Sequence, residues 1–313
     1  QCPDDFDSDG IINNIDLDQD NDGILNSVES RGIGNIDFSN TASPTINLSD
    51  GTAINGAISG LVNGDGSLSG QNQSFEMQVE AGVDQELKYA LTFTENLNIN
   101  VKDNPNVSVA IRNGESFIIK SSPASSNITL LDPSNNLLVD TNFDDEFENN
   151  VTEFTSNEIR FKFNTNSTAT IDYELFATKI DGVTFTHKYS TTETGESVFV
   201  PNVYVYDYKN DSDGDGNEDM FDLDSDNDGC DDIIEADFTA LENYQGDPDN
   251  DGIYGDGTQT FDNGLVNSRG LIKVHNDADG YNTDPKKDSN GNYLFQIAGN
   301  PVQIIDEPSS TEG

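Results

Sequence analysis

Hydrophobic and polar residues alternate in short runs through the middle of the chain, from about Gly34 to Tyr208. β-Branched and aromatic residues are frequent in these runs, as in strands that bury one face. No long stretch here repeats with the 3.6-residue period of a helix. The alternation predicts strands at Ser74–Glu80, Glu86–Thr94, Glu158–Phe163, Thr168–Leu175, Gly182–Tyr189 and Ser197–Tyr206.

Asn, Gly, Ser and Pro residues separate these runs, so the predicted strands are short and joined by turns. About ten such strands in one segment are typical of an antiparallel β-sandwich. The predicted fold class is therefore mainly β, with a jelly-roll-like antiparallel β-sandwich at residues 32–209.

The acidic residues follow a repeat of their own on either side of this region. Loops that begin Asp-x-Asp-x-Asp-Gly open at Asp5 and Asp18, thirteen residues apart, and again at Asp211 and Asp224. The tripeptide Asp-Leu-Asp joins the two loops of each pair. The chain therefore carries two copies of a two-loop cassette, at residues 1–31 and 210–236, and a Gly/Asp-rich irregular region follows at residues 237–313.

Each loop matches the calcium loop of the EF-hand, which supplies oxygens from positions 1, 3, 5, 7, 9 and 12 and has glycine at position 6. Positions 1, 3, 5, 9 and 12 hold Asp5, Asp7, Asp9, Asn13 and Asp16 in the first loop, and Asp18, Asp20, Asp22, Asn26 and Glu29 in the second. They hold Asp211, Asp213, Asp215, Asp219 and Asp222 in the third, and Asp224, Asp226, Asp228, Asp232 and Glu235 in the fourth. Position 7 would contribute only its backbone carbonyl, from Ile11, Ile24, Asn217 and Cys230.

The spacing indicates a cation, because alternate residues of a tight turn aim their carboxylates at one point. Two carboxylates about 5 Å apart repel by roughly 3 kcal/mol at an effective dielectric constant near 20. Oxygen donors select a hard cation, and the large number of ligands favours Ca²⁺ over Mg²⁺. The alternative, a solvated acidic linker, does not explain four loops in phase. The sequence therefore predicts four Ca²⁺ sites.

Two further segments are weaker candidates for metal loops. Asp247, Asp249 and Asp251 open a loop whose position 12 is Thr258, although Asp256 offers a substitute carboxylate. A segment at residues 275–286 has histidine at position 1 and lysine at position 12. These departures leave the ligand set of each loop incomplete.

Position 11 of each loop is apolar, which predicts a small anchor beneath it. The four residues are Ile15, Val28, Phe221 and Ile234. Each cassette is too short to bury a core of its own, so bound metal is expected to supply the missing stability. In the C-terminal region, Phe238–Tyr244 has the pattern of a short helix, and Leu271–Val274 and Tyr293–Ile297 are apolar anchors.

The composition limits the partners of the chain. Its 313 residues carry 59 acidic and 14 basic side chains, a formal net charge of −45. Such a charge repels nucleic acid and anionic membrane surfaces, so neither is an expected partner. No run of residues has the length and apolar character of a signal peptide or membrane span, and we expect the chain to be a mature or excised piece of a longer product.

The flanks of the loops differ from those of an EF-hand. Only four residues precede Asp5, Ser30–Gly34 cannot continue a helix, and a thirteen-residue step leaves no room for one. The cassettes instead resemble thrombospondin type-3 repeats, in which consecutive Asp-rich loops wind around calcium ions. Residues 222–229, Asp-Leu-Asp-Ser-Asp-Asn-Asp-Gly, and the Glu-Ala that follows at 235–236 resemble those of large surface adhesins of gliding Bacteroidota, such as the SprB-type gliding adhesin.

The resemblance covers about 60 residues and does not identify the sandwich. It implies a secreted, cell-surface protein in which calcium stiffens the links between modules. The expected partners are neighbouring modules of the same long chain and a surface glycan or protein ligand. The expected function is that of a calcium-stabilised structural or adhesive module.

Cys2 and Cys230 are the two cysteines, and an extracellular chain invites a disulfide. A bond between them would join the two cassettes and make the sandwich an insertion. Closing so long a loop would contribute about 5 kcal/mol in the chain-entropy interpretation. Pairing with cysteines of neighbouring modules is the alternative, and the intrachain bond is slightly favoured.

An enzymatic function finds little support in the sequence, and we expect none. His187 and His275 have no obvious nucleophile or metal partner close in sequence, and the sequence has no Gly-x-Ser-x-Gly, His-Glu-x-x-His or P-loop motif. A secreted hydrolase with two acids brought together by the fold is the third hypothesis. A glycan-binding module is the second, because Tyr204, Tyr206 and Tyr208 alternate on one predicted strand, although the chain has no Trp.

Overall fold

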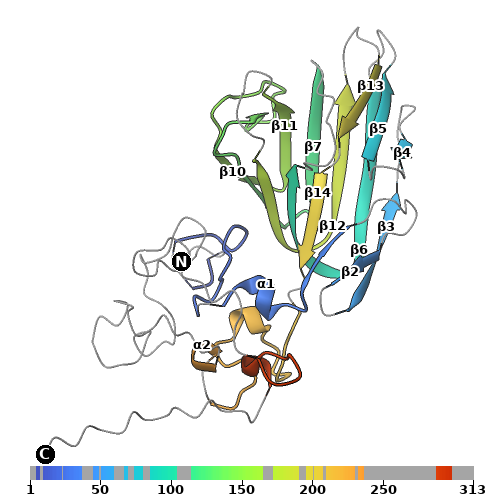
Figure 1. The fold of residues 1–313 in the computed structure, drawn as a ribbon. Coiled ribbons are helices and arrows are strands. Elements are labelled where there is room, and N and C mark those ends of the chain that lie inside the picture. Colours follow the sequence, from blue (N-terminus) through green and yellow to red (C-terminus); the bar gives the residue numbers. More distant parts are fainter. Residues whose placement is uncertain are drawn as a thin grey trace, which may run out of the picture. The chain divides into compact units, whose positions relative to one another are not determined.

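The computed structural model describes residues 5–7, 10–22, 24–36, 45–48, 51–59, 67–69, 74–79, 85–103, 114–164, 172–189, 195–199, 201–206, 209–229, 232–235 and 287–297. The chain divides into two compact units (Figure 1). The sandwich unit is Arg31–Tyr208, and the cassette unit combines Gln1–Ser30 with Lys209–Gly313. The sandwich is therefore inserted between two segments of one unit.

Strands dominate the described residues, which confirms the mainly β prediction. They are β1 Ile33–Asn35, β2 Thr45–Asn47, β3 Ala53–Ser59, β4 Ser67–Ser69, β5 Ser74–Val79, β6 Gln85–Asp103, β7 Glu115–Ser122, β8 Ile128–Leu131, β9 Leu137–Val139, β10 Glu153–Ser156, β11 Glu158–Phe163, β12 Glu174–Tyr189, β13 Gly195–Phe199 and β14 Pro201–Tyr206. The helical segments are single turns, α1 Asn26–Glu29, η1 Asp219–Phe221, α2 Asp232–Glu235 and η3 Leu294–Gln296. None of the described helices is long and apolar enough to span a membrane.

Within the described part of the chain, eleven strands form one antiparallel sheet, and three more, β13, β5 and β4, form a second. In the large sheet, β6 and β12 are long enough to take part in two layers. Residues 182–189 of β12 pair with β7, whereas residues 174–176 pair with β8. In the same way, the first half of β6 pairs with β3 and its second half with β14. Two bent strands thus connect the layers of the sandwich.

The bend lies where the register between β6 and β12 shifts, between Ala177 and Gly182 of β12. Lys179 has a φ of 52°, and its N–H donates to Oδ1 of the buried Asn98 at 2.9 Å. A Cβ on Gly182 would lie 2.7 Å from the carbonyl oxygen of Leu91. Glycine therefore lets the two strands approach closely at the bend.

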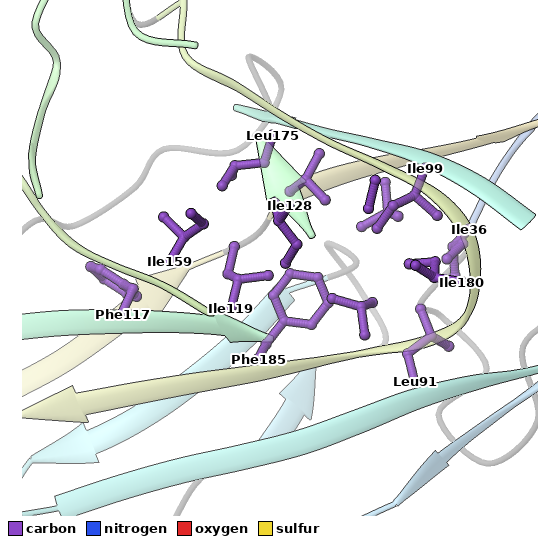
Figure 2. Packing of buried hydrophobic residues seen from close by; sticks show 14 of the residues in the cluster. Ile36, Leu91, Ile99, Phe117, Ile119, Ile128, Ile159, Leu175, Ile180 and Phe185 are labelled. Carbon is purple, nitrogen blue, oxygen red and sulfur yellow. The ribbon is translucent and has the colours of Figure 1, made fainter. Parts of the chain in front are cut away.

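Buried apolar side chains of both layers fill the space between them (Figure 2). Phe117, Ile119 and Phe185 come from one layer and Ile128 and Leu175 from the other. Ile180 lies at the bend of β12, and it is fully buried. Burying apolar surface stabilises a fold by about 25 cal/mol per Å². We therefore regard this core as the main source of stability of the sandwich unit.

Candidate metal centre

A side chain at position 9 closes every one of the four loops. Its Oδ1 atom accepts a hydrogen bond from the backbone N–H at position 2, and we call this contact the loop clasp. The four clasps are Phe6 to Asn13 at 2.9 Å, Gln19 to Asn26 at 2.9 Å, Ser212 to Asp219 at 2.8 Å, and Ser225 to Asp232 at 2.8 Å. The sequence predicted these residues as metal ligands and not as acceptors that close the loop. Asn and Asp side chains commonly accept such bonds from nearby backbone N–H groups.

A second bond and a helical turn complete the frame of the last three loops. The N–H at position 9 donates to the carbonyl of the residue before position 1, from Asn26 to Leu17 at 3.0 Å, Asp219 to Asn210 at 2.7 Å and Asp232 to Leu223 at 3.0 Å. Positions 9 onward then form α1, η1 and α2. Each turn carries the acid of position 12, or ends just before it, so the terminal carboxylate is brought back toward its loop.

The first half of each loop is shaped by carboxylates that bond to the backbone. In the fourth loop, Oδ1 of Asp224 accepts from the N–H of Asp228 at 3.1 Å, and its Oδ2 accepts from Gly229 at 3.0 Å. The third loop repeats the second bond between Asp211 and Gly216, at 3.2 Å. Position 6 has a positive φ, 103° at Gly216 and 91° at Gly229, which explains its glycine.

Position 4 also has a positive φ, a feature that the sequence prediction missed. The φ angles there are 63° at Asn21, 78° at Gly214 and 55° at Asn227. Asn is the residue other than Gly that most readily adopts this conformation. The Asn or Gly at position 4 was a signal in the sequence that could have strengthened the loop prediction.

The acids of three loops meet in clusters whose ligand atoms lie within 4.8 Å of one another. The three predicted sets at positions 1, 3 and 5 are Asp18, Asp20 and Asp22; Asp211, Asp213 and Asp215; and Asp224, Asp226 and Asp228. A fourth cluster joins Asp22 and Glu29 of the first cassette with Asp232 of the second. No sequence argument predicted this fourth combination.

Among the described loop acids, those of the second loop form the most deeply buried set. Asp18, Asp20, Asp22 and Glu29 are each at most 1% exposed, whereas the third-loop cluster is half-buried to exposed. Among the described residues, no hydrogen-bond donor reaches either Oε atom of Glu29 or Oδ2 of Asp20 and Asp22. The same is true of both Oε atoms of Glu235 and of Oδ2 of Asp226 in the fourth loop. A buried carboxylate oxygen with no donor is costly unless an ion compensates it.

The electrostatics of these loops are those of acids held together without a counter-charge. Burial raises the pKa of Asp20, Asp22 and Glu29 well above the ordinary carboxyl range, and neighbouring acids raise it further. Burial and then Asp226 raise the pKa of Glu235 to about 8. Burial also raises the pKa of Asp219 to about 6, against hydrogen bonds that lower it. In the absence of a cation, these loops therefore favour protonated carboxyls.

The terminal acids of the last three loops lie close enough to the acids of their own loops for the charges to interact. Asp224, Asp226 and Asp228 each raise the pKa of Glu235, and Asp213 and Asp215 raise that of Asp222 after burial. The position 7 residues of the described loops differ: Ile24 is buried, Ile11 is half-buried, and Asn217 is exposed and donates to Asp215 at 2.8 Å. The donor set consists of oxygen atoms and fits a hard divalent cation with many ligands.

The first loop is described in part. Asp5 and Asp7 are half-buried, and Oδ1 of Asp16 accepts from the N–H of Asp18 at 2.9 Å, which links the two loops of the cassette. The joint of the second cassette repeats this bond between Asp222 and Asp224 at 3.2 Å. Asp9 lies outside the described residues, so its place among these acids is not part of the structure.

The apolar anchors predicted beneath the loops are confirmed at Ile15, which is buried. Around the second loop, Ile24 and Phe295 are fully buried and form a small core to which Val28 and Tyr293 add. Phe221 contacts Phe6, with ring centroids 4.9 Å apart. The predicted C-terminal anchor at Tyr293–Ile297 thus packs against the first cassette.

The other C-terminal predictions and the cysteines lie outside the described residues. These are Cys2, Cys230, His275, the side chain of Ile234, the helix at Phe238–Tyr244, the apolar segment Leu271–Val274 and the loop acids Asp247, Asp249 and Asp251. The disulfide and the two weaker metal loops therefore stay predictions.

One connection in the sandwich unit reproduces the loop frame with a different counter-charge. Asp140 accepts from Asp144 and Asp145, both at 3.1 Å, and Oε2 of Glu148 accepts from the N–H of Thr141 at 2.9 Å, as a loop clasp does. Nη1 of Arg160 lies 3.6 Å from Oδ2 of Asp140. The frame by itself therefore does not mark a metal site, and the buried oxygens without donors are what distinguish the second and fourth loops as candidates.

The remaining functional candidates lie in the sandwich. His187 is buried beside Glu115, with Nε2 3.6 Å from Oε1, and stacks on Phe117, so it is part of the core. Tyr204 is 37% exposed, and Nζ of Lys102 lies 5.7 Å from the centroid of its ring. The side chain of Tyr206 and all of Tyr208 lie outside the described residues.

Comparison with known proteins does not identify a family for this chain. No protein-family model matches the chain, and no curated protein sequence matches it. What is established is a mainly β, antiparallel protein whose described residues include four acidic clusters that could hold metal ions.

Proposed function

We propose that this chain is a calcium-stabilised structural and adhesive module of a secreted, cell-surface adhesin. The observation that carries the proposal is the burial of Glu29 and Glu235, each 0% exposed, with no hydrogen-bond donor at either Oε atom among the described residues. A bidentate carboxylate at position 12 of a loop is the ligand that Ca²⁺ takes in EF-hand geometry. A bound cation turns the repulsion in each cluster into attraction.

A structural role is favoured over catalysis by where the acids lie. A catalytic metal needs a coordination position that substrate can reach. The acids of the second loop are at most 1% exposed and packed beside the core of Ile24 and Phe295, which suits an ion that holds the chain together. The resemblance to thrombospondin type-3 repeats supports calcium as the ion and linkage of modules as its purpose.

The experiment is calorimetry of the whole chain with calcium and after its removal, together with a count of bound ions. We expect calcium to raise the melting temperature of one transition, that of the cassette unit, and to leave the sandwich transition nearly unchanged, because ligands stabilise only the unit that binds them. Three loops have described clusters, so fewer than three ions per chain would contradict the proposal. Equal melting with and without calcium would contradict it as well.

Glycan binding is the second candidate for the sandwich, favoured by the exposed ring of Tyr204 beside Lys102. An exposed aromatic face is a platform on which a sugar ring can stack, and the nearby ammonium group suits an acidic sugar. A glycan array with the wild type and Tyr204→Ala tests it. Binding that disappears in the variant supports a lectin function, and an array without any bound glycan removes this candidate.

A further inference from the structure

Asp232 belongs to the fourth loop by sequence but reaches the acids of the second. Its carboxylate forms a cluster with those of Asp22 and Glu29, within 4.8 Å, and these three side chains are at most 1% exposed. Residues 29 and 232 are separated by about 200 positions in the chain. The equivalent residue of the third loop, Asp219, is also 1% exposed but belongs to none of the four clusters.

The oxygens at this place are available to an ion. Glu29 is fully buried, and among the described residues neither of its Oε atoms, nor Oδ2 of Asp22, accepts a hydrogen bond. Both oxygens of Asp232 accept bonds from Ser225, through its N–H at 2.8 Å and its hydroxyl at 2.5 Å. A carboxylate oxygen has two lone pairs, so Asp232 can hold the fourth loop closed and bind a cation at once.

The C-terminal segment of the same polypeptide also holds the two cassettes together. The Nε2 atom of Gln296 donates to the backbone carbonyl of Glu29 at 3.2 Å and to Oδ2 of Asp219 at 3.0 Å. One side chain from the C-terminal region thus bonds to both cassettes. The acids of the cluster are brought together by packing that does not depend on their own charge.

We propose that one Ca²⁺ is bound jointly by Asp22 and Glu29 of the first cassette and Asp232 of the second. This ion ties together the two chain segments that enter and leave the sandwich unit. The proposal rests on the calcium binding proposed above and adds to it that the second site is incomplete without the second cassette. Loss of the ion therefore weakens the link between the cassettes as well as loosening one loop.

A double-mutant cycle on the whole chain tests the shared ion. The variants are Glu29→Gln, Asp232→Asn and their combination, with bound calcium counted by equilibrium dialysis at a free concentration that just saturates the wild type. We expect each single variant to weaken one site by roughly tenfold or more, because calcium affinity follows the charge of the ligands. Each then loses one ion, and the double variant also loses only one, because both residues bind the same ion.

The matched control is Asp219→Asn, alone and with Glu29→Gln. Asp219 has the same loop position, burial and clasp, but lies outside the cluster. Its effect is expected to add to that of Glu29→Gln. If Asp232→Asn adds to Glu29→Gln in the same way, the shared ion is wrong, although calcium binding itself stands. If the wild type binds no calcium, both proposals fall.

A second variant separates charge from loop closure. Asp232→Asn keeps an Oδ1 atom for the Ser225 N–H, and Ser225→Ala keeps the charge of Asp232 but removes the hydroxyl bond. We expect Ser225→Ala to retain the full ion count. If it loses the same ion as Asp232→Asn, closure of the fourth loop explains the effect and the proposal is wrong. Near-ultraviolet circular dichroism in saturating calcium verifies that each variant is folded.

Discussion

At the scale of single residues, the loops depend on two backbone positions with positive φ. Position 6 was predictable because only glycine recurs there, and Gly216 and Gly229 confirm it with φ angles of 103° and 91°. Position 4 was not predicted, because Asn and Gly both occur and neither is unusual in an acidic loop. The geometry shows what they share, since Asn21, Gly214 and Asn227 all adopt the left-handed conformation.

Gly216→Ala is expected to destabilise the third loop by about 1–2 kcal/mol through backbone strain. A Cβ there meets no atom within 4 Å, so a steric clash does not contribute. Gly214→Asn is the control in the same loop, since Asn occupies the equivalent position of the second and fourth loops, and its effect is expected within about 0.5 kcal/mol. Thermal unfolding of the cassette unit in excess calcium measures both. Equal destabilisation by the two variants would contradict the assigned roles.

At the scale of elements, the sandwich differs from its prediction in how the strands are divided. Thr168–Leu175 and Gly182–Tyr189 were predicted as two strands, but the end of the first, all of the second and the residues between them form the single strand β12. Asp181-Gly182 has the sequence of a turn, but in the structure the glycine lies at a bend within a continuous strand. The bend requires Gly182 because the backbone of Leu91 passes so close, and no local pattern reveals that neighbour.

β7 was missed for a different physical reason. Phe117, Ile118 and Ile119 are consecutive and all buried, so apolar and polar residues do not alternate there. A strand covered on both faces lacks the two-residue period that identified β11, whose predicted limits are confirmed.

Gly182→Ala tests the bend between the layers. The new Cβ atom would lie 2.7 Å from the carbonyl oxygen of Leu91, which is a backbone atom and cannot rotate away. We expect a loss of about 1–3 kcal/mol in the stability of the sandwich unit, typical of overpacking. Thr184→Ala, at a half-buried position of the same strand, is the control and should cost less. Denaturant unfolding gives the comparison, and an unchanged midpoint for Gly182→Ala would show that the bend tolerates a side chain.

At the scale of the whole molecule, the local and the distant parts of the site differ in how far they could be predicted. The carboxylates at positions 1, 3 and 5 come together within six residues, so their spacing alone predicts three of the four clusters. The fourth cluster depends on how the two cassettes pack, which involves Ile24, Phe295 and Gln296 far apart in sequence. Sequence periodicity contains no information about such contacts.

The stability of the cassette unit should depend on pH with opposite signs in the presence and absence of calcium. Without calcium, the folded pKa values of Asp219 and Glu235 are raised to about 6 and about 8. Their contribution is fully present below the unfolded values near pH 4 and is lost as the pH rises through 6 and 8. With calcium bound, the ligating carboxylates have lowered pKa values, so their contribution is present at neutral pH and is lost on acidification.

Melting temperatures between pH 5 and pH 8 measure this reversal. Protein stripped of metal by a chelating resin is preferable to added chelator, whose own affinity for calcium changes with pH. We expect the melting temperature of the cassette unit to fall with rising pH in the stripped protein and to rise with pH in excess calcium. Parallel curves would show that the buried acids are not the calcium ligands.

The insertion of the sandwich between two segments of one unit also determines how the molecule carries mechanical load. A pulling force applied at residues 1 and 313 enters and leaves through the cassette unit, because both segments of that unit belong to the same compact body. While the cassettes stay joined, the tension crosses from one to the other and bypasses the β-sheet. An ion shared by Glu29 and Asp232 would lie on that path, so the free calcium concentration would determine the force at which the sandwich is first loaded.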